Sequence, residues 1–242
     1  MLKFRLFGIP VGVHVTFLFV ALLGATNYSG WDIAIWTAAA FVSILAHELG
    51  HALTARGFGA RGVDVTLYGL GGLTSYSHGR EISHGKSFLI SAAGSTVGIV
   101  LGGAVWFAAR NGVFDGAGHE AIVFVNSFFF TALVWGVLNW IPIVPLDGGH
   151  MVQHLAAMYS EDKAPLIGQI VTWATAAFVV PYAWLNGYQF GAIIVTMFAF
   201  AGLREYRATV ARRRAAVEPP AEPQPAPPAD PTPPQPPPEF PI

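Results

Sequence analysis

The sequence predicts an all-α polytopic membrane protein with about six transmembrane helices and a short membrane-associated β-hairpin between the second and third. Of the 242 residues, 53% are hydrophobic and only 11% are charged, whereas soluble domains carry roughly 25% charged residues. The mean hydropathy is +0.51. The apolar residues also gather in six segments of near-spanning length for a hydrocarbon core of about 30 Å.

The net charge and the absence of cysteine limit the partners and the metal ligands that the chain can have. The formal net charge is −1, which argues against a nucleic-acid partner. The chain contains no cysteine, so it forms no disulfides, and a zinc ion would have to be held by histidine, aspartate or glutamate.

The first predicted span covers residues 9–26, within a first region at 1–30. Its basic start and apolar run are like those of a signal peptide. We find no small-residue cleavage site with a soluble domain behind it, so we interpret it as a retained span. The second predicted span covers residues 31–58, and its stretch 33–46 contains no charged residue.

Residues 59–86 are more polar and richer in glycine. Within them, β-branched and aromatic residues broken by glycines at 62–76 predict a short hairpin. The remaining predicted spans are 87–109, 121–141, 166–184 and 190–203. The third of the six has small residues suited to close helix packing, and the fourth ends at Pro142 and Pro145.

These segments divide the chain into further regions. A three-span catalytic core is predicted at 31–150, and the fifth and sixth spans with a basic end at 151–216. The last 26 residues, 217–242, hold 13 of the 18 prolines, which predicts a disordered tail leaning toward polyproline II. This tail could dock an aromatic-lined groove of a partner, although a solvated spacer is the simpler interpretation.

The basic residues indicate the orientation of the six spans. An even number of spans places both termini on one side, and twelve of the thirteen basic residues then fall on that side, with only Arg110 on the other. This is the positive-inside pattern, so we expect both termini to be cytoplasmic.

The chain is organised around the sequence HELGH at residues 47–51. Because positions four apart lie on the same face of an α-helix, His47 and His51 can direct two imidazoles at one metal ion. Glu48 lies beside them as a candidate general acid and base rather than a ligand. Three ionisable residues that continue an uncharged apolar helix are costly in lipid and indicate a functional site.

A second motif, NWIPIVPLDGG at 139–149, follows the fourth span. Two histidines leave a zinc site short of the usual three protein ligands. Asp147 arrives at the cytoplasmic end of an antiparallel span, at the depth that HELGH reaches, so it can meet the histidines. The prolines before it break the helix, and unwound backbone at that depth requires a buried or wet environment.

HELGH in a membrane helix, with N-x-x-P-x-x-P-L-D-G-G two spans later, resembles the site-2 protease family of intramembrane zinc metalloproteases, in its compact prokaryotic form. The match covers roughly residues 31–150. The resemblance implies that His47, His51 and Asp147 bind one zinc ion per chain, and that Glu48 is the catalytic acid and base. It also implies a multi-pass protein of the cell membrane.

The resemblance further implies substrate-binding residues. Asn139 is similar to the family's asparagine that engages the substrate, and the hairpin with Gly71 and Gly72 is similar to its glycine-containing, membrane-dipping β element. The chain departs from many members at Gly94-Ser95, where they have Gly-Pro, and from some at Gly98, where they carry asparagine. We expect both departures to affect substrate fit more than metal chemistry.

Two functional classes are compatible with these residues. The first is a zinc endopeptidase that cuts membrane-spanning proteins, commonly membrane-tethered regulators in this family. The second is a non-proteolytic membrane protein that binds or transports metal. The ionisable residues cluster at one depth instead of forming a path, and Glu48 is needed only by a hydrolase, so the sequence favours the enzyme.

Other histidines have simpler interpretations. His150 and His154 follow Asp147 at helical spacing and could bind a second metal, but Gly148 and Gly149 weaken the helix they would need, so solvated side chains are favoured. His14 is interpreted as a pocket-facing or interfacial residue. His78, His84 and His119 are interpreted as surface residues.

Overall fold

The computed structural model describes residues 1–69, 71–78 and 82–217. The predicted proline-rich tail therefore lies, apart from its first residue, outside the described residues. The strands are β1 (Leu2–Leu6), β2 (Ile9–Val13), β3 (Arg61–Tyr68) and β4 (Gly71–Ser77). The helical elements are η1 (Val15–Leu18), α1 (Phe19–Gly24), α2 (Trp31–Gly57), α3 (His84–Arg110), α4 (His119–Phe129), η2 (Phe130–Val134), α5 (Trp135–Asn139), α6 (Asp147–Ala157), α7 (Ala164–Leu185) and α8 (Gln189–Val217).

Four helical segments in the described part of the chain are long and apolar enough to cross a membrane. They are α2, α3, the continuous run His119–Asn139 formed by α4, η2 and α5, and α7. Helix α8 is longer than any of them, but its apolar stretch at 190–203 ends at Arg204. The prediction of a mainly helical, multi-pass membrane protein is confirmed, whereas the count of six spans is not.

The first predicted span, residues 9–26, is wrong as a transmembrane helix. Its beginning forms strand β2, and the helical part, Val15–Gly24, is only about 15 Å long at 1.5 Å per residue. The segment before it alternates apolar and basic residues in β1 and turns back at Phe7 and Gly8, both with positive φ. This alternation is typical of a strand.

These strands extend the predicted hairpin into a four-stranded sheet with the order β1-β2-β3-β4. Strands β3 and β4 occupy the segment where the hairpin was expected and are antiparallel. Strand β2 pairs with β3 in parallel, with Val11 opposite Val65. Such pairing joins strands that are far apart in the sequence, so an N-terminal apolar run can satisfy its backbone without becoming a helix.

The sheet packs against the second half of α2 and forms the main hydrophobic core with it. Buried residues of β2 and β3, among them Ile9 and Leu67, lie in one cluster with Leu45 and Leu49 of α2. This packing fixes the sheet beside the stretch of α2 that carries HELGH.

Helices α2 and α3 approach closely at glycines. A Cβ atom on Gly50 would lie 2.9 Å from the main-chain oxygen of Ala93 and from the α-carbon of Gly94. On the same helix α3, a Cβ atom on Gly102 would lie 2.6 Å from the main-chain nitrogen of Leu133 in η2, which is a π-helical turn. The small residues of α3 therefore serve helix packing, as the sequence predicted.

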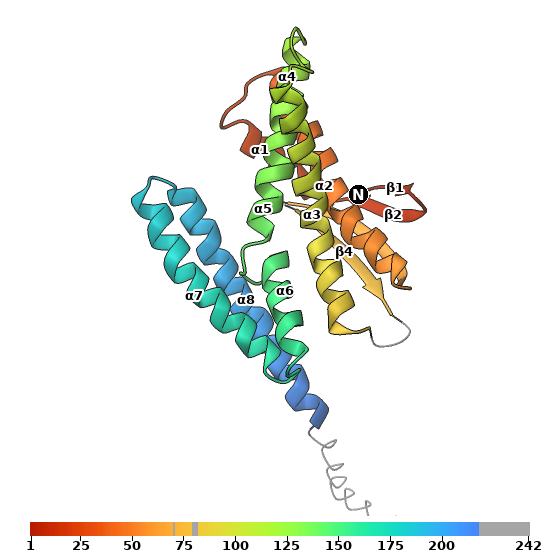
Figure 1. The fold of residues 1–242 in the computed structure, drawn as a ribbon, viewed down its shortest axis with the longest axis vertical. Helices are drawn as coiled ribbons and strands as arrows, with labels where there is room; N and C mark the ends of the chain where they lie inside the picture. The colour runs from red at the N-terminus through yellow and green to blue at the C-terminus, as the bar shows by residue number, and fades with distance from the viewer. Residues whose placement is uncertain (70, 79–81, 218–242) are drawn as a thin grey trace, which may run out of the picture.

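The last helices form a second layer (Figure 1). Helices α7 and α8 make a hairpin beside the core, and α6 lies between this hairpin and α3. The loop before α6 is held from α7, because the main-chain N–H of Val144 donates to the buried hydroxyl of Thr172 at 3.0 Å. The approach of Asp147 to the core is thus set by α7.

Adjacent glycines on α3 provide a test of this packing. We expect Gly102→Ala to lower the thermal unfolding temperature of the purified protein in detergent, because overpacking costs about 1–3 kcal/mol and exceeds the gain in helix propensity of up to about 1 kcal/mol. Gly103→Ala is the matched control, since a Cβ atom there meets nothing within 4 Å. Equal unfolding temperatures for the two variants would contradict this account of the helix interface.

Candidate metal centre

The two histidines of HELGH face one point beside α2. Their Nε2 atoms are 3.2 Å apart, and both residues are less than 10% exposed. They are four positions apart on one uninterrupted helix, so the spacing alone brings the rings together, as the sequence predicted. The imidazole rings meet edge to face, with centroids 4.8 Å apart.

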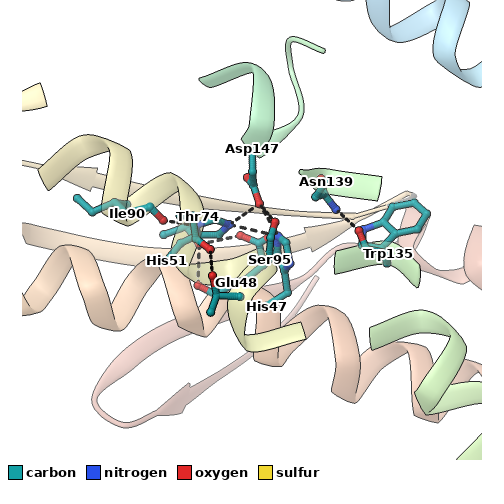
Figure 2. Close-up of polar contacts among 11 residues, drawn as sticks. His47, Glu48, His51, Thr74, Ile90, Ser95, Trp135, Asn139 and Asp147 are labelled. Atoms are coloured by element: carbon teal, nitrogen blue, oxygen red, sulfur yellow. Dashed lines mark hydrogen bonds and ion pairs between the residues drawn. The ribbon is translucent and has the colours of Figure 1, made fainter. Parts of the chain in front are cut away.

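Asp147 completes the group from α6, of which it is the first residue. Its Oδ2 atom lies 3.3 Å from His47 Nε2 and 3.4 Å from His51 Nε2. Figure 2 shows the carboxylate entering from the opposite side to α2. The three predicted ligands are therefore brought together.

The separations between these three atoms fit a zinc ion. Bonds of about 2.0–2.1 Å in a tetrahedral arrangement place neighbouring ligand atoms about 3.3 Å apart. The three observed separations, from 3.2 to 3.4 Å, agree with this value. Within the described residues this is the group of histidine, aspartate and glutamate side chains that could hold a metal ion.

The hydrogen bonding of His51 also favours a cation. Its Nδ1 atom lies 2.6 Å from the main-chain oxygen of Ile90, which can only accept, so Nδ1 carries the proton. A neutral His51 then directs the lone pair of Nε2 at His47 Nε2 and at the Asp147 carboxylate. Converging acceptors in a buried site are stabilised by a positive ion, and a metal-binding histidine usually donates its other ring N–H to a carbonyl or carboxylate in this way.

Glu48 stands apart from the ligand group and faces strand β4. The residue is 5% exposed. The Thr74 hydroxyl lies 2.7 Å from Glu48 Oε2 and 3.0 Å from the Glu48 main-chain oxygen. It is the hydrogen-bond donor, and these two oxygens are the acceptors. Gly72 leaves room for the carboxylate, since a Cβ atom on it would lie 2.3 Å from Glu48 Cγ. The sheet therefore packs directly on the candidate acid and base.

The other predicted substrate-binding residues lie beside this centre. The Asn139 side chain donates to the main-chain oxygen of Trp135 at 3.0 Å, away from the three ligands (Figure 2). Asn139 lines an apolar cavity of about 660 Å³ between α2, α5 and α8. A Cβ atom on Gly71 would meet nothing within 4 Å, so this glycine borders open space. Their roles stay predictions.

A second histidine group lies where α3 begins and α6 ends. His84 Nε2 is 2.9 Å from Glu161 Oε1. Burial, followed by the charges of His150 and His84, lowers the pKa of His154 to about 4. Helix α6 does continue through Gly148 and Gly149, contrary to the expectation that these glycines weaken it. These histidines do not join a metal-binding group among the described residues.

Comparisons with known proteins point to one family. The chain is 24% identical over 208 residues to the zinc metalloprotease MJ0392 of Methanocaldococcus jannaschii, covering 84% of this chain and 59% of that protein. It is 30% identical over 173 residues to the putative zinc metalloprotease Rip3 of Mycobacterium tuberculosis, covering 67% and 43%. The matched region therefore spans about half the length of these relatives. No family model matches the chain.

The structural comparison agrees with these relatives. The site-2 protease from Methanocaldococcus jannaschii superposes with a TM-score of 0.60 at 23% identity, covering 83% of this chain and 94% of that one. The site-2 protease resemblance is confirmed. The two relatives are named zinc metalloproteases, and in this chain His47, His51 and Asp147 form a group that could hold a metal ion.

Sequence reasoning missed three residues that support the centre. They are Ile90, Thr74 and Ser95, and Ser95 Oγ donates to Asp147 Oδ2 at 2.5 Å. Ser95 was expected to affect substrate fit, yet its hydroxyl contacts a candidate metal ligand. The only hint in the sequence was that Ser95 stands where many family members have proline. A serine hydroxyl in an apolar span needs a hydrogen-bond partner, and proline has no hydroxyl.

Metal analysis of purified protein tests this centre. We expect about one zinc ion per chain, lost in His47→Ala, His51→Ala and Asp147→Ala, because each removes one of three protein ligands. His154→Ala, on the same helix as Asp147, is the matched control and should retain zinc. Full zinc content in Asp147→Ala would rule out Asp147 as the third ligand.

Proposed function

We propose that this protein is a zinc-dependent intramembrane endopeptidase that hydrolyses peptide bonds in or near transmembrane helices of other proteins. The observation that carries this proposal is the arrangement around α2. Two histidines and an aspartate converge as a ligand group, while Glu48, outside that group, is held by a separate hydrogen bond. The helix that carries them is long and apolar enough to cross a membrane.

In this proposal His47, His51 and Asp147 would hold the zinc ion. When bound, zinc supplies Lewis-acid polarisation of a peptide carbonyl and of water. Glu48 accepts the proton of the attacking water and passes it to the nitrogen of the leaving amine, because a carboxylate free of the metal can change its protonation state during the reaction. The Thr74 hydroxyl keeps the Glu48 carboxylate in one orientation. The burial of Glu48 excludes competing solvent contacts.

The alternative of a metal carrier finds less support in the geometry. A carrier needs successive polar sites along its path, whereas the described residues contain one converging group. Glu48 is next to that group in sequence but is bound to Thr74. An intramembrane carboxylate kept apart from the metal ligands has a use in hydrolysis and none in simple binding.

The apolar cavity beside the centre supports a membrane-spanning substrate. Its lining is almost wholly apolar and includes Leu146, which directly precedes Asp147, and Ile44, one turn before His47. The cavity is therefore lined by residues that are close in sequence to two of the three ligands, and α8 forms part of its wall. Asn139 lines it as well, and we propose that its amide holds a main-chain group of the substrate there.

Strand β4 offers a way to bind the unwound part of a substrate. It is the last strand of the sheet and pairs only with β3 among the described residues. It also carries Gly72 and Thr74, which contact Glu48. We propose that substrate adds to the outer edge of β4, so that its main-chain groups regain the hydrogen bonds lost when its helix unwinds. Gly71 permits close backbone approach at this edge.

We also propose an orientation for the chain in the cell membrane. The basic residues near the end of α2, at the start of α3 and in the second half of α8, among them Arg56, Lys86 and Arg204, would lie on the cytoplasmic side. Helix α8 then returns beside α7 to that side. In this orientation residues 14–30, which include the short helical part Val15–Gly24, carry the chain from β1 and β2 on the cytoplasmic side to the start of α2 on the other, so both termini are cytoplasmic. The division into residues 31–150 as catalytic core and 151–216 as a supporting helical region follows from this arrangement.

Replacement of Glu48 tests the proposed chemistry. We expect Glu48→Gln to retain zinc and thermal stability but to lose at least about 100-fold in cleavage of a membrane-spanning substrate in proteoliposomes, because a positioned acid and base contributes 10²–10⁴-fold. Glu120→Gln, an exposed acid on α4, should cleave normally. Near-normal turnover by Glu48→Gln would remove Glu48 from this role.

The strand-addition proposal is tested at Leu73, an exposed residue of β4 that pairs with Thr66. We expect Leu73→Pro to slow cleavage of a helical substrate while zinc content is unchanged, because proline removes an N–H group and stiffens the strand. Leu73→Ala keeps the N–H group and serves as control. A substrate with glycine or proline near the scissile bond should be cut faster than its all-leucine counterpart. Wild-type rates for Leu73→Pro on both substrates would exclude strand addition.

A further inference from the structure

The hydroxyl of Ser95 makes a contact that the proposed function does not use. Ser95 is fully buried on α3, and its Oγ atom donates to Asp147 Oδ2 at 2.5 Å. This carboxylate oxygen is the same atom that faces the Nε2 atoms of His47 and His51. Ser95 therefore contacts the ligand group through Asp147 alone (Figure 2).

The orientation of the Ser95 hydroxyl is unusual for a helix. Serine and threonine hydroxyls within helices commonly donate back to the carbonyl one turn earlier. The neighbouring Thr96 does so, donating to the main-chain oxygen of Ala92 at 2.7 Å. Ser95 instead reaches across to α6, so its hydrogen bond joins two elements that are separated by the whole fourth span.

The Asp147 carboxylate needs a hydrogen-bond partner because the residues that follow it fix the position of its backbone but not of its side chain. Gly148 and Gly149 follow it and pack against the preceding loop, where Cβ atoms would lie 2.3 Å from the Trp140 oxygen and 2.4 Å from the Val144 nitrogen. Neither glycine offers a side chain to the carboxylate. In the described part of the chain, the hydrogen bond from Ser95 is the contact that selects the carboxylate rotamer from outside the histidine pair.

We propose that Ser95 is a positioning residue that holds Asp147 in its ligand geometry and thereby sets the metal affinity of the centre. This inference rests on the proposed function in so far as Asp147 binds the metal. A neutral hydroxyl donates one hydrogen bond to the carboxylate and leaves its charge in place, so the oxygen keeps a free lone pair toward the histidines. Chains with proline at this position cannot make the bond, since proline has no hydroxyl.

The effect is measured as zinc affinity of the full-length protein in detergent, by competition with a chelator. Loss of an outer partner of a metal ligand typically weakens metal binding 10- to 100-fold, and we expect this for Ser95→Ala. Thr96→Ala removes a hydroxyl from the next residue of the same helix and should bind zinc as wild type does. Ser95→Thr, which keeps the hydroxyl, should restore most of the affinity.

Two further measurements separate positioning from general destabilisation. The visible absorption of the Co²⁺-substituted protein should change in Ser95→Ala and not in Thr96→Ala, because it reports ligand geometry. An Asp147→Ala protein no longer retains zinc on purification, so its weak residual affinity is measured with added zinc. Ser95→Ala should not lower this residual affinity further, since it acts through that carboxylate.

The outcomes distinguish this inference from the proposed function. If wild-type protein binds zinc and Ser95→Ala binds it equally well with an unchanged cobalt spectrum, the role of Ser95 is refuted while the proposed enzyme stands. An additive loss in the Asp147→Ala background also refutes it. If wild-type protein binds no zinc, both the metal centre and the role of Ser95 are overturned.

Discussion

A helix that carries ionisable side chains through a membrane must provide a partner for each of them, and the rest of this structure follows from that requirement. Helix α2 buries His47, Glu48 and His51 within about one turn. Unpartnered polar groups in such surroundings cost several kcal/mol each. The partners come from three separate elements: Asp147 of α6, Thr74 of β4 and the main-chain oxygen of Ile90 of α3.

Close approach of these elements depends on residues without side chains. Gly50 brings α3 against α2, Gly94 leaves room for the His51 ring, and Gly72 leaves room for Glu48. A β-carbon at any of these positions would separate the polar groups from their partners. Helix packing and the polar network therefore depend on the same glycines, because hydrogen bonds of 2.5–3.0 Å form only when the backbones approach this closely.

The ligand group and Glu48, the proposed proton-transfer group, share helix α2, but their side chains are held by different neighbours. The three ligand atoms are held by α2, α3 and α6, whereas Glu48 is held by the sheet. Changes in the sheet can thus reorient Glu48 without moving Asp147. The cavity toward α8 is lined by Asn139 and by Leu146, the residue that precedes Asp147.

The sequence by itself predicted the class of protein and the residues of the candidate ligand group, because both depend on local or compositional properties. The i, i+4 spacing of His47 and His51 is a property of any helix, and Asp147 followed from the absence of cysteine and from matching depth in antiparallel spans. Only the tertiary structure decided that the N-terminal apolar run is strand β2, paired with a strand beyond α2. An apolar run of that length has no periodicity that separates a buried strand from a span. The partners Ser95 and Thr74 were also beyond the sequence, because a side-chain hydrogen bond between distant elements exists only once their packing brings the two atoms together.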